Sequence, residues 1–261
     1  MKFAIVQDSR KGARPYNQDR LGHWRAPEAL LMAVADGMGG YKGGELAAAA
    51  TLEHLAQAFR AQAKPNLIDP EQFLARAIRG AHAAVVQAGR DAGLGHEPRT
   101  TIVACVVQGG YAFWASIGDS RLYLIRAGRI AARTKDHTYV QQLIDAGRIR
   151  EEAVSVHPER SKLLRCLGGL AEPGQEPVAS ARLAKGDLVL LCSDGLWAPL
   201  TPRLILTGLI GKEPAHALPG LMALAEMRAG ATCDNVSALV MQWHDDAILD
   251  LRVDTRPTLT P

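Results

Sequence analysis

The sequence predicts an α+β fold in which helices are layered on a mainly antiparallel sheet. Two helical patterns follow each other directly at 45–63 and 70–92, and a second helical pair is expected at 202–210 and 215–228. Between these pairs lie strand patterns joined by short glycine turns of the kind that link hairpins. Strands and helices therefore do not alternate as parallel βαβ units would require, which favours an antiparallel, layered arrangement.

The first half of the chain supplies an opening strand, a buried strand and the first helix pair. Residues 2–6 are expected to form the opening strand, and the unbroken apolar run 29–35 a fully buried strand. Asp69 has the residue type and the position of an N-cap for the helix at 70–92. The alanine-rich helix at 45–63 carries one apolar stripe, made of Leu46, Leu52, Leu55 and Phe59.

The second half begins with strands and closes with one. In chain order we expect strands at 100–107, 111–117 and 121–126, a short helix at 139–146, a strand at 187–193, the second helical pair, and a strand at 236–243. Gly109-Gly110 is expected to join the first two of these strands, and Gly118-Asp119-Ser120 the next two, as hairpin-type turns.

The composition indicates one large domain, or two small ones, and excludes several functional classes. The chain has 261 residues, of which 48% are hydrophobic, so it can bury a sizeable core. Its net charge is only +3, and no block of Lys and Arg marks a nucleic-acid surface. No stretch approaches the ~18 apolar residues of a membrane span, and we expect a cytoplasmic location. The cysteines lack CxxC spacing and are expected to be free, mostly buried thiols: Cys105, Cys166, Cys192 and Cys233.

Four aspartates in short acidic islands are the main functional signal. Asp36 and Asp194 each follow an apolar, strand-like run, and Asp19 and Asp234 lie in similar polar turns. Taken singly, each is explained by the preference of Asp for turns and caps. If the fold brings them together, their carboxylates repel one another unless a cation holds them. Hard oxygen ligands of this kind favour magnesium or manganese over zinc.

Six short motifs in fixed order extend this signal over residues 1–243. They are Arg14-x-x-Asn17-Gln18-Asp19, Val34-Ala35-Asp36-Gly37-Met38-Gly39-Gly40, Ile117-Gly118-Asp119-Ser120-Arg121, Thr134-x-Asp136-His137, Leu191-Cys192-Ser193-Asp194-Gly195-Leu196-Trp197 and Asp234-Asn235-Val236-Ser237. In this order they resemble the metal-dependent protein serine/threonine phosphatases of type 2C, in their compact bacterial form. Each fixed position matches by chance about one time in twenty, so six ordered motifs are strong evidence where one Asp-Gly pair is none.

The resemblance implies a four-layer α-β-β-α sandwich, in which two mainly antiparallel sheets are flanked by helix pairs. It implies one catalytic domain over 1–243 with a small flap near the active site at about 138–177, and a C-terminal tail, 244–261, whose end is expected to be disordered. The implied reaction is hydrolysis of phosphoserine and phosphothreonine in proteins by direct attack of a metal-bridging hydroxide, without a phospho-enzyme. In agreement, no cysteine has the arginine six residues downstream that a cysteine-dependent phosphatase loop needs.

Carried over by position, the resemblance assigns metal-binding roles to the acidic islands. Asp36 would bridge two ions, and the Gly37 carbonyl would bind one of them. Asp194 and Asp234 would bind the other ion, and Asp19 would act through metal-bound water. The cofactors implied are two to three divalent ions, manganese or magnesium.

Two further residues complete the implied site. Asp119 matches the residue that, with Asp194, binds a third ion in bacterial members. Arg14 matches the phosphate-binding arginine, whose planar fork suits two phosphate oxygens better than a lysine does. The residues with implied catalytic roles are therefore Arg14 and Asp36.

The chain departs from the family pattern at two positions. Gln18 stands where many members have Glu, so one negative charge beside the metal site is missing. Met38 stands where animal members carry a His assigned as the general acid, and a thioether cannot donate a proton. His137 is a candidate acid by residue type, although the Asp-His pair is more readily explained as ordering a turn.

We predict a monomeric protein phosphatase whose partners are phosphorylated protein substrates, in opposition to a bacterial serine/threonine kinase and its targets. No nucleic-acid or membrane partner is expected. Two alternatives stay open, a catalytically weak module that binds phosphoproteins or metal, and a small-molecule phosphomonoesterase. Basic residues of the flap either meet acidic segments of the substrate or form a solvated face: Arg148, Arg150, Arg160, Lys162 and Arg165.

Overall fold

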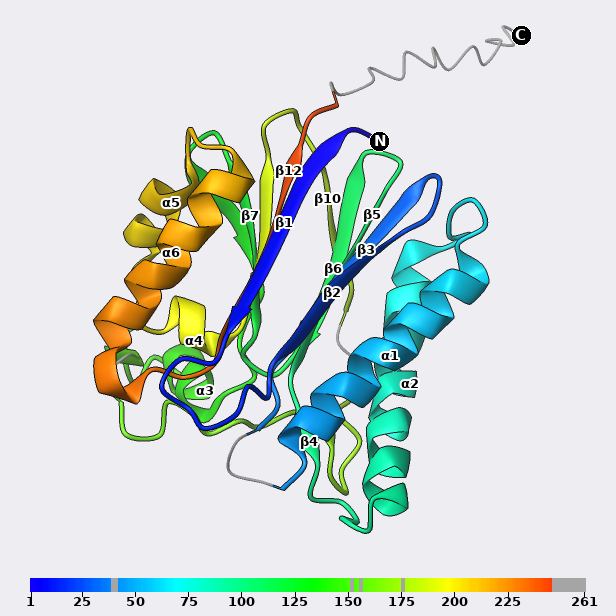
Figure 1. The fold of residues 1–261 in the computed structure, drawn as a ribbon, viewed down its shortest axis with the longest axis vertical. Helices are drawn as coiled ribbons and strands as arrows, with labels where there is room; N and C mark the ends of the chain where they lie inside the picture. Colours follow the sequence, from blue (N-terminus) through cyan, green and yellow to red (C-terminus); the bar gives the residue numbers. More distant parts are fainter. Residues whose placement is uncertain (39–41, 151–152, 155–156, 175–176, 246–261) are drawn as a thin grey trace, which may run out of the picture.

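Two five-stranded sheets face each other in the computed structural model of the protein (Figure 1). The structure describes residues 1–38, 42–150, 153–154, 157–174 and 177–245. The first sheet has the order β1 (Phe3–Arg10), β12 (Val236–Trp243), β11 (Leu188–Cys192), β7 (Arg121–Arg126) and β8 (Arg129–Arg133). The second has the order β10 (Ala179–Arg182), β6 (Tyr111–Ile117), β5 (Ile102–Gln108), β3 (Ala29–Ala35) and β2 (Arg20–Arg25). Every pairing within the two sheets is antiparallel, which confirms the predicted fold class.

Helix pairs cover the outer faces of the sandwich, and small elements gather at one end. The second sheet is covered by α1 (Gly44–Gln62) and α2 (Pro70–Asp91), and the first by α5 (Pro202–Leu209) and α6 (Pro214–Ala229) (Figure 1). The end of the sandwich away from the N-terminus carries α3 (Tyr139–Asp145), α4 (Asp194–Trp197) and the strand pair β4 (Arg99–Thr100) and β9 (Leu167–Gly168). A 3₁₀ turn at Gly230–Thr232 precedes β12.

The predicted N-cap of α2 is confirmed. The Asp69 side chain accepts a hydrogen bond from the backbone N–H of Gln72 at 2.9 Å, and Pro70 occupies the first helical position. Proline suits that position because its missing N–H has no helical partner to lose.

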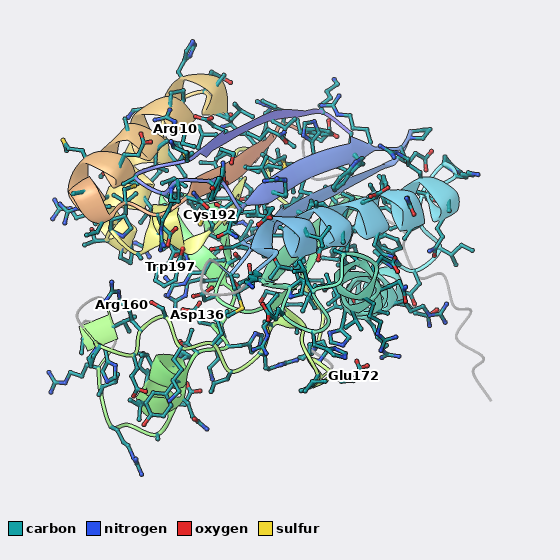
Figure 2. The ribbon with its side chains drawn as sticks, turned by 60° about the horizontal axis from the view of Figure 1, so that its bottom comes forward. Arg10, Asp136, Arg160, Glu172, Cys192 and Trp197 are labelled. Carbon is teal, nitrogen blue, oxygen red and sulfur yellow. The ribbon has the colours of Figure 1, made fainter. Side chains whose placement is uncertain are left out.

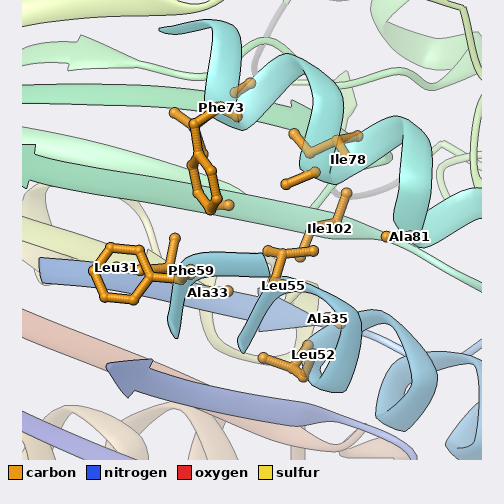
Figure 3. Packing of buried hydrophobic residues seen from close by; sticks show 14 of the residues in the cluster. Leu31, Ala33, Ala35, Leu52, Leu55, Phe59, Phe73, Ile78, Ala81 and Ile102 are labelled. Atoms are coloured by element: carbon orange, nitrogen blue, oxygen red, sulfur yellow. The ribbon is translucent and has the colours of Figure 1, made fainter. Parts of the chain in front are cut away.

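The central strands are apolar along their whole length because both of their faces are covered. Alternate residues of a strand point in opposite directions. One set from β3 packs against α1 and α2, and comprises Ala29, Leu31, Ala33 and Ala35. The other set lies between the two sheets, and comprises Leu30, Met32 and Val34. Figure 3 shows part of the first set beside three residues of α1, Leu52, Leu55 and Phe59.

One predicted turn is wrong. Gly109-Gly110 does join β5 and β6 in a hairpin, with Gln108 opposite Tyr111. The segment 118–120, expected as a second hairpin turn, instead carries the chain from β6 in one sheet to β7 in the other. Since both sheets are covered on both faces, an apolar run does not reveal which sheet the next strand joins.

The sequence also missed four strands, β2, β8, β9 and β10. Three of them, β2, β8 and β10, are edge strands with polar or arginine-rich sequences. Charged edges are common because an unpaired, apolar edge would pair with other molecules. The same charges hide the period-2 pattern on which strand prediction depends.

Several expectations concern the ends and the connections of the chain. All four cysteines are free, and Cys105, Cys192 and Cys233 are buried as expected. The predicted flap, 138–177, contains α3 and β9. The tail from residue 246, and the glycine-rich segment 39–41, lie outside the described residues, and the domain boundaries stay a prediction. Among the described residues, no helix is both long and apolar enough to cross a membrane.

Candidate active site

Four of the predicted aspartates line a cleft of about 750 Å³ at the end of the sandwich that carries α4. They are Asp36, Asp119, Asp194 and Asp234. Asp19 is only 2% exposed and lies against this group, where its carboxylate and those of Asp36, Asp194 and Asp234 affect one another electrostatically. Residues 161–166 and 168–173 of the predicted flap also line the cleft, and Arg14, Met38, Arg99 and Thr101 complete the lining.

Asp36 is positioned by the end of β3 and by two threonines. Its backbone N–H donates to Thr101 Oγ1 at 3.0 Å, and its carbonyl oxygen accepts from the Thr101 N–H at 2.9 Å and from Thr100 Oγ1 at 2.8 Å. A Cβ on the following residue, Gly37, would lie 2.3 Å from the carbonyl oxygen of Gly44. The Asp-Gly pair is therefore required by packing, because no side chain fits at position 37.

Asp194 is brought to Asp234 by a close contact between backbones. Asp194 is the first residue of α4, directly after β11 and Ser193. A Cβ on Gly195 would lie 2.0 Å from the carbonyl oxygen of Asn235, so only glycine lets α4 approach this segment. The two aspartates, 40 positions apart in the sequence (234 − 194), thus reach the same cleft.

The side chain of Asn235 holds the loop that carries Arg14. Its Nδ2 donates to the carbonyl oxygens of Lys11 and Tyr16, each at 2.8 Å, and its Oδ1 accepts from the backbone N–H of Gln18 at 2.8 Å. Loop residues at both ends of the Arg14 segment are therefore tied to the residue that follows Asp234.

Asp19 is held by a ring of small polar side chains. Ser193 Oγ donates to Asp19 Oδ2 at 2.8 Å and accepts from the Ser237 N–H at 3.0 Å. Asn17 Oδ1 accepts from the Asp19 N–H at 3.1 Å, and Asn17 Nδ2 donates to Ser9 Oγ at 2.8 Å. The second carboxylate oxygen of Asp19, Oδ1, is buried and has no hydrogen-bond partner among the described residues.

The turn that carries Asp119 is connected to α4 through an indole and a guanidinium. Trp197 Nε1 donates to the carbonyl oxygen of Asp119 at 2.9 Å. The guanidinium carbon of Arg121 lies 3.4 Å from the centre of the Trp197 ring, within cation–π range. Arg121 also donates to both carboxylate oxygens of Asp136, at 2.8 and 2.6 Å. Figure 2 shows Trp197 and Asp136 at the boundary between the sandwich and the predicted flap.

Burial and mutual repulsion raise the pKa values of these carboxylic acids. Burial is the main cause, and it raises the pKa of Asp19 to about 6 and that of Asp194 to about 7. The pKa values of Asp36 and Asp119 are raised as well, first by burial and then by the neighbouring charges of Asp19 and Asp194 respectively. A cluster destabilised by its own negative charge gains most from a cation bound among its oxygens.

The donor set fits divalent cations in its chemistry. All of the clustered side-chain donors are hard carboxylate oxygens, and within the described part of the chain the buried Oδ1 of Asp19 has no hydrogen-bond partner. Asp234 Oδ2 accepts a hydrogen bond from Arg14 Nη2 at 2.7 Å. As the side chains stand, no group of three or more His, Cys, Asp or Glu residues in the described ranges is arranged to hold an ion. The residues suit a metal, whereas the side-chain orientations seen here do not by themselves enclose one.

The structure shows the surroundings of Gln18 and Met38, which depart from the family pattern, and of His137, the candidate acid. Gln18 Nε2 donates to Glu45 Oε2 at 3.0 Å, so a carboxylate of α1 stands beside the amide. Met38 lines the cleft. His137 is not among the residues that line the cleft. Its ring Nδ1 accepts from the backbone N–H of Gly118 at 3.1 Å, and its backbone N–H donates to the Gly118 carbonyl oxygen at 2.8 Å. His137 therefore orders the turn before Asp119, as the turn explanation predicts.

Sequence reasoning missed several residues that position the site. Ser193, Asn235 and Trp197 lie inside the matched motifs, and their nearness to a ligand-type Asp was the only available signal. Thr100 and Thr101 carried no signal, because they lie about 65 positions from Asp36 and read as the start of a strand. Arg99, which lines the cleft, was likewise unmarked.

Comparison with known proteins identifies related sequences and folds. A family model described as protein phosphatase 2C matches residues 7–205. The serine/threonine protein phosphatase PstP of Mycobacterium tuberculosis is 39% identical over 219 residues, which cover 83% of this chain and 41% of PstP. A putative protein phosphatase 2C-type of Streptococcus pyogenes is 29% identical over 94% of this chain and 99% of its own length. The chain thus spans about two fifths of the length of the first of these curated relatives.

The solved structures agree with the fold. A crystal structure of the catalytic domain of PstP, in complex with two manganese ions, superposes with a TM-score of 0.79 at 31% identity, covering 93% of this chain and 99% of that one. The family match extends over most of the chain, including Arg14 and four of the five clustered aspartates, Asp19, Asp36, Asp119 and Asp194. The chain belongs to the protein phosphatase 2C family.

Proposed function

We propose that the protein is a metal-dependent protein serine/threonine phosphatase. The observation that carries this proposal is the group of buried and half-buried carboxylates at a cleft whose rim holds Arg14. Family membership supports it, as do the names of the relatives, which are protein phosphatases. The manganese ions in the PstP catalytic domain support a divalent cation as the cofactor.

The carboxylates of the cleft are the proposed metal ligands. Asp36 is assigned to two ions, with the Gly37 carbonyl completing one position and Asp194 and Asp234 the other. Asp119 would add a position shared with Asp194, and Asp19 would act through metal-bound water. The proposed cofactors are two to three manganese or magnesium ions. When bound, such ions acidify a coordinated water and neutralise the phosphoryl oxygens.

Arg14 is the proposed phosphate-binding residue. Its side chain is 50% exposed at the rim, and it contacts Asp234 through Nη2. A guanidinium presents further N–H groups in the same plane, so Arg14 can orient two phosphoryl oxygens over the carboxylates. The Asn235 hydrogen bonds to the loop keep that guanidinium at the rim.

The leaving-group proton is assigned to water in the cleft. Met38 lines the cleft but has no proton to donate. The His137 ring accepts a backbone hydrogen bond through Nδ1 and lies outside the cleft lining, so it takes no catalytic role. A cleft of about 750 Å³ holds water together with the substrate.

Hydrolysis of a phosphothreonine peptide tests the proposal. The purified protein is assayed with manganese, with magnesium and with chelator, alongside Asp36→Asn. We expect metal-dependent phosphate release that both the chelator and the substitution abolish. A folded protein that releases no phosphate with either metal would favour the binding-module alternative instead.

The substrate class and the partners are proposals as well. A comparison of phosphopeptide with small aryl and sugar phosphates separates a protein phosphatase from a small-molecule phosphomonoesterase. We propose that phosphorylated proteins are the substrates and that the protein acts in the cytoplasm as a monomer, opposing a serine/threonine kinase. These finer points rest on the resemblance alone.

A further inference from the structure

A buried cluster of side chains beside the cleft contains an ion pair that the proposed chemistry does not use. Arg121 and Asp136 are 8% and 7% exposed and form two parallel hydrogen bonds of 2.8 and 2.6 Å. Arg121 also donates to the hydroxyl of Tyr123 at 3.0 Å and stacks on the ring of Trp197. Burying two charges costs free energy that a paired geometry only offsets, so stability alone does not account for this arrangement.

The cluster joins the two segments that present Asp119 and Asp194 to the cleft. Arg121 lies two residues after Asp119, and Trp197 is the last residue of the short helix that Asp194 begins. Trp197 Nε1 donates to the carbonyl oxygen of Asp119 itself, at 2.9 Å. The strand register places Arg121 opposite Cys192, two residues before Asp194. Each segment is therefore attached to the other at two points.

We propose that Arg121, Asp136 and Trp197 form a clamp that fixes the spacing between the carboxylates of Asp119 and Asp194. The three are positioning residues, since they touch neither substrate nor metal in the assignment above. The inference rests on the proposed function in one respect, namely that these two carboxylates share a metal ion. A clamp of this kind keeps two like charges at a separation that a shared cation can bridge, where repulsion would otherwise drive them apart.

The geometry requires arginine and tryptophan in particular. A lysine at position 121 has neither the planar fork that makes two parallel hydrogen bonds to Asp136 nor a flat face that stacks on the Trp197 ring. A phenylalanine at position 197 keeps the stacking surface but has no N–H for the Asp119 carbonyl oxygen. Trp197→Phe thus removes one link of the clamp and, of the packed side chain, only the five-membered ring that carries the N–H.

The same strand supplies a matched control at its other end. Arg126, the last residue of β7, also forms a bidentate pair, with Nε 3.0 Å from Asp187 Oδ1 and Nη2 2.6 Å from Oδ2. Asp187 directly precedes β11, and the pair lies at the end of the β7–β11 ladder opposite to Arg121. Arg126→Lys therefore damages an ion pair of the same bidentate geometry away from the cleft, with an arginine that is more exposed than Arg121.

The test is a manganese-binding isotherm, measured by calorimetry on the full chain for the unmodified protein and the three variants. Trp197→Phe is expected to weaken the weakest-bound manganese ion by about tenfold, as loss of a partner behind a metal ligand commonly does. Arg121→Lys is expected to weaken it further, and Arg126→Lys to leave the isotherm unchanged. Thermal unfolding in chelator shows whether each variant is folded.

The outcomes separate the clamp from a purely structural role and from the proposed function. If Trp197→Phe and Arg121→Lys lower the unfolding temperature as Arg126→Lys does but leave the isotherm intact, the clamp is overturned. It is equally overturned if the unmodified protein binds no manganese. If the protein binds manganese but hydrolyses no phosphopeptide, the proposed function fails while the isotherms of the variants still decide the clamp.

Discussion

Arg14 meets two kinds of anion at one place, the carboxylate of Asp234 and, in the proposed reaction, a phosphoryl group. Its Nη2 lies 2.7 Å from Asp234 Oδ2, so the guanidinium is already oriented along the rim of the cleft. The exposed side chain pays little desolvation to exchange one anion for the other. The same contact lets a neighbouring carboxylate keep the arginine in place between turnovers.

Replacing Arg14 by lysine tests this dual contact. Arg14→Lys keeps the charge but loses the planar fork, so we expect kcat/KM for a phosphothreonine peptide to fall roughly 10–100-fold, the value of a charge-assisted hydrogen bond. Inorganic phosphate should also inhibit the variant more weakly. Arg25→Lys, at the far end of β2, serves as the control. Equal kinetics for the two variants would exclude Arg14 as the phosphate ligand.

At this scale the sequence revealed ligand-type residues better than the residues that hold them. Asp36, Asp119, Asp194 and Asp234 do meet at one cleft, as their motifs predict. The hydrogen bonds between Asp36 and Thr101 could not be predicted, because contact between residues some 65 positions apart depends on how β3 and β5 pair. A hydroxyl has no sequence pattern that distinguishes a buried donor from a solvated one.

Among the elements, the four-residue helix α4 has the strictest packing requirement. Gly195 lies so close to the Asn235 carbonyl that an added Cβ would be 2.0 Å from its oxygen. The helix is too short to be stable alone, so this contact and the burial of Leu196 hold it on β12. The position of Asp194 therefore depends on backbone packing.

A methyl group at position 195 should separate α4 from β12. We expect Gly195→Ala to lower the unfolding free energy by about 1–3 kcal/mol, as overpacking does, and to weaken manganese binding as well. Gly220→Ala provides the comparison, because Gly220 is in the exposed face of α6 with nothing within 4 Å of an added Cβ. That change should stabilise the helix by up to about 1 kcal/mol. Urea titrations of both variants measure the difference, and equal stabilities would contradict the packing argument.

The elements also show where sequence patterns suffice. The helices α1 and α2 and the strands β3, β6, β7 and β12 lie where their periodicity predicts, with boundaries that agree within two residues. The edge strands β2, β8 and β10 were missed because their exposed polar and arginine residues obscure the strand pattern. The connection at 118–120 was assigned to the wrong type because both sheets bury both faces. Local patterns predict elements, whereas the choice between two sheets is made by long-range packing.

Across the whole molecule, the carboxylate cluster links stability to pH and to metal. The pKa values of Asp19 and Asp194 are raised to about 6 and about 7, above their usual value near 4 in an unfolded chain. Between the pKa of the unfolded chain and the raised pKa of each group, the folded protein holds more protons than the unfolded chain. The contribution of these two groups to the free energy of unfolding in chelator is therefore greatest below about pH 4, and it is lost as the pH rises through 6 to 7.

Thermal unfolding at several pH values checks this linkage. In chelator we expect the contribution of Asp19 and Asp194 to the free energy of unfolding to fall as the pH rises from about 4 to about 7, by about 1.4 kcal/mol per pH unit for each extra bound proton. Manganese should remove most of the decline, because the ions replace the protons. Asp36→Asn, which carries one charge fewer in the cluster, should show a shallower decline in chelator. Identical slopes for the variant and the unmodified protein would show that the cluster does not set this dependence.

The strand order of the first sheet ties the cleft to the order of synthesis. β12 lies between β1 and β11, and Asp234 stands just before it, 220 positions after the Arg14 that it contacts. A nascent chain that has left the ribosome only as far as Thr232 carries Asp19, Asp36, Asp119 and Asp194 but has a gap in the middle of that sheet. The proposed metal site is thus complete only when β12 is inserted between β1 and β11. If the protein has the proposed function, an incomplete copy lacks the site that this function requires.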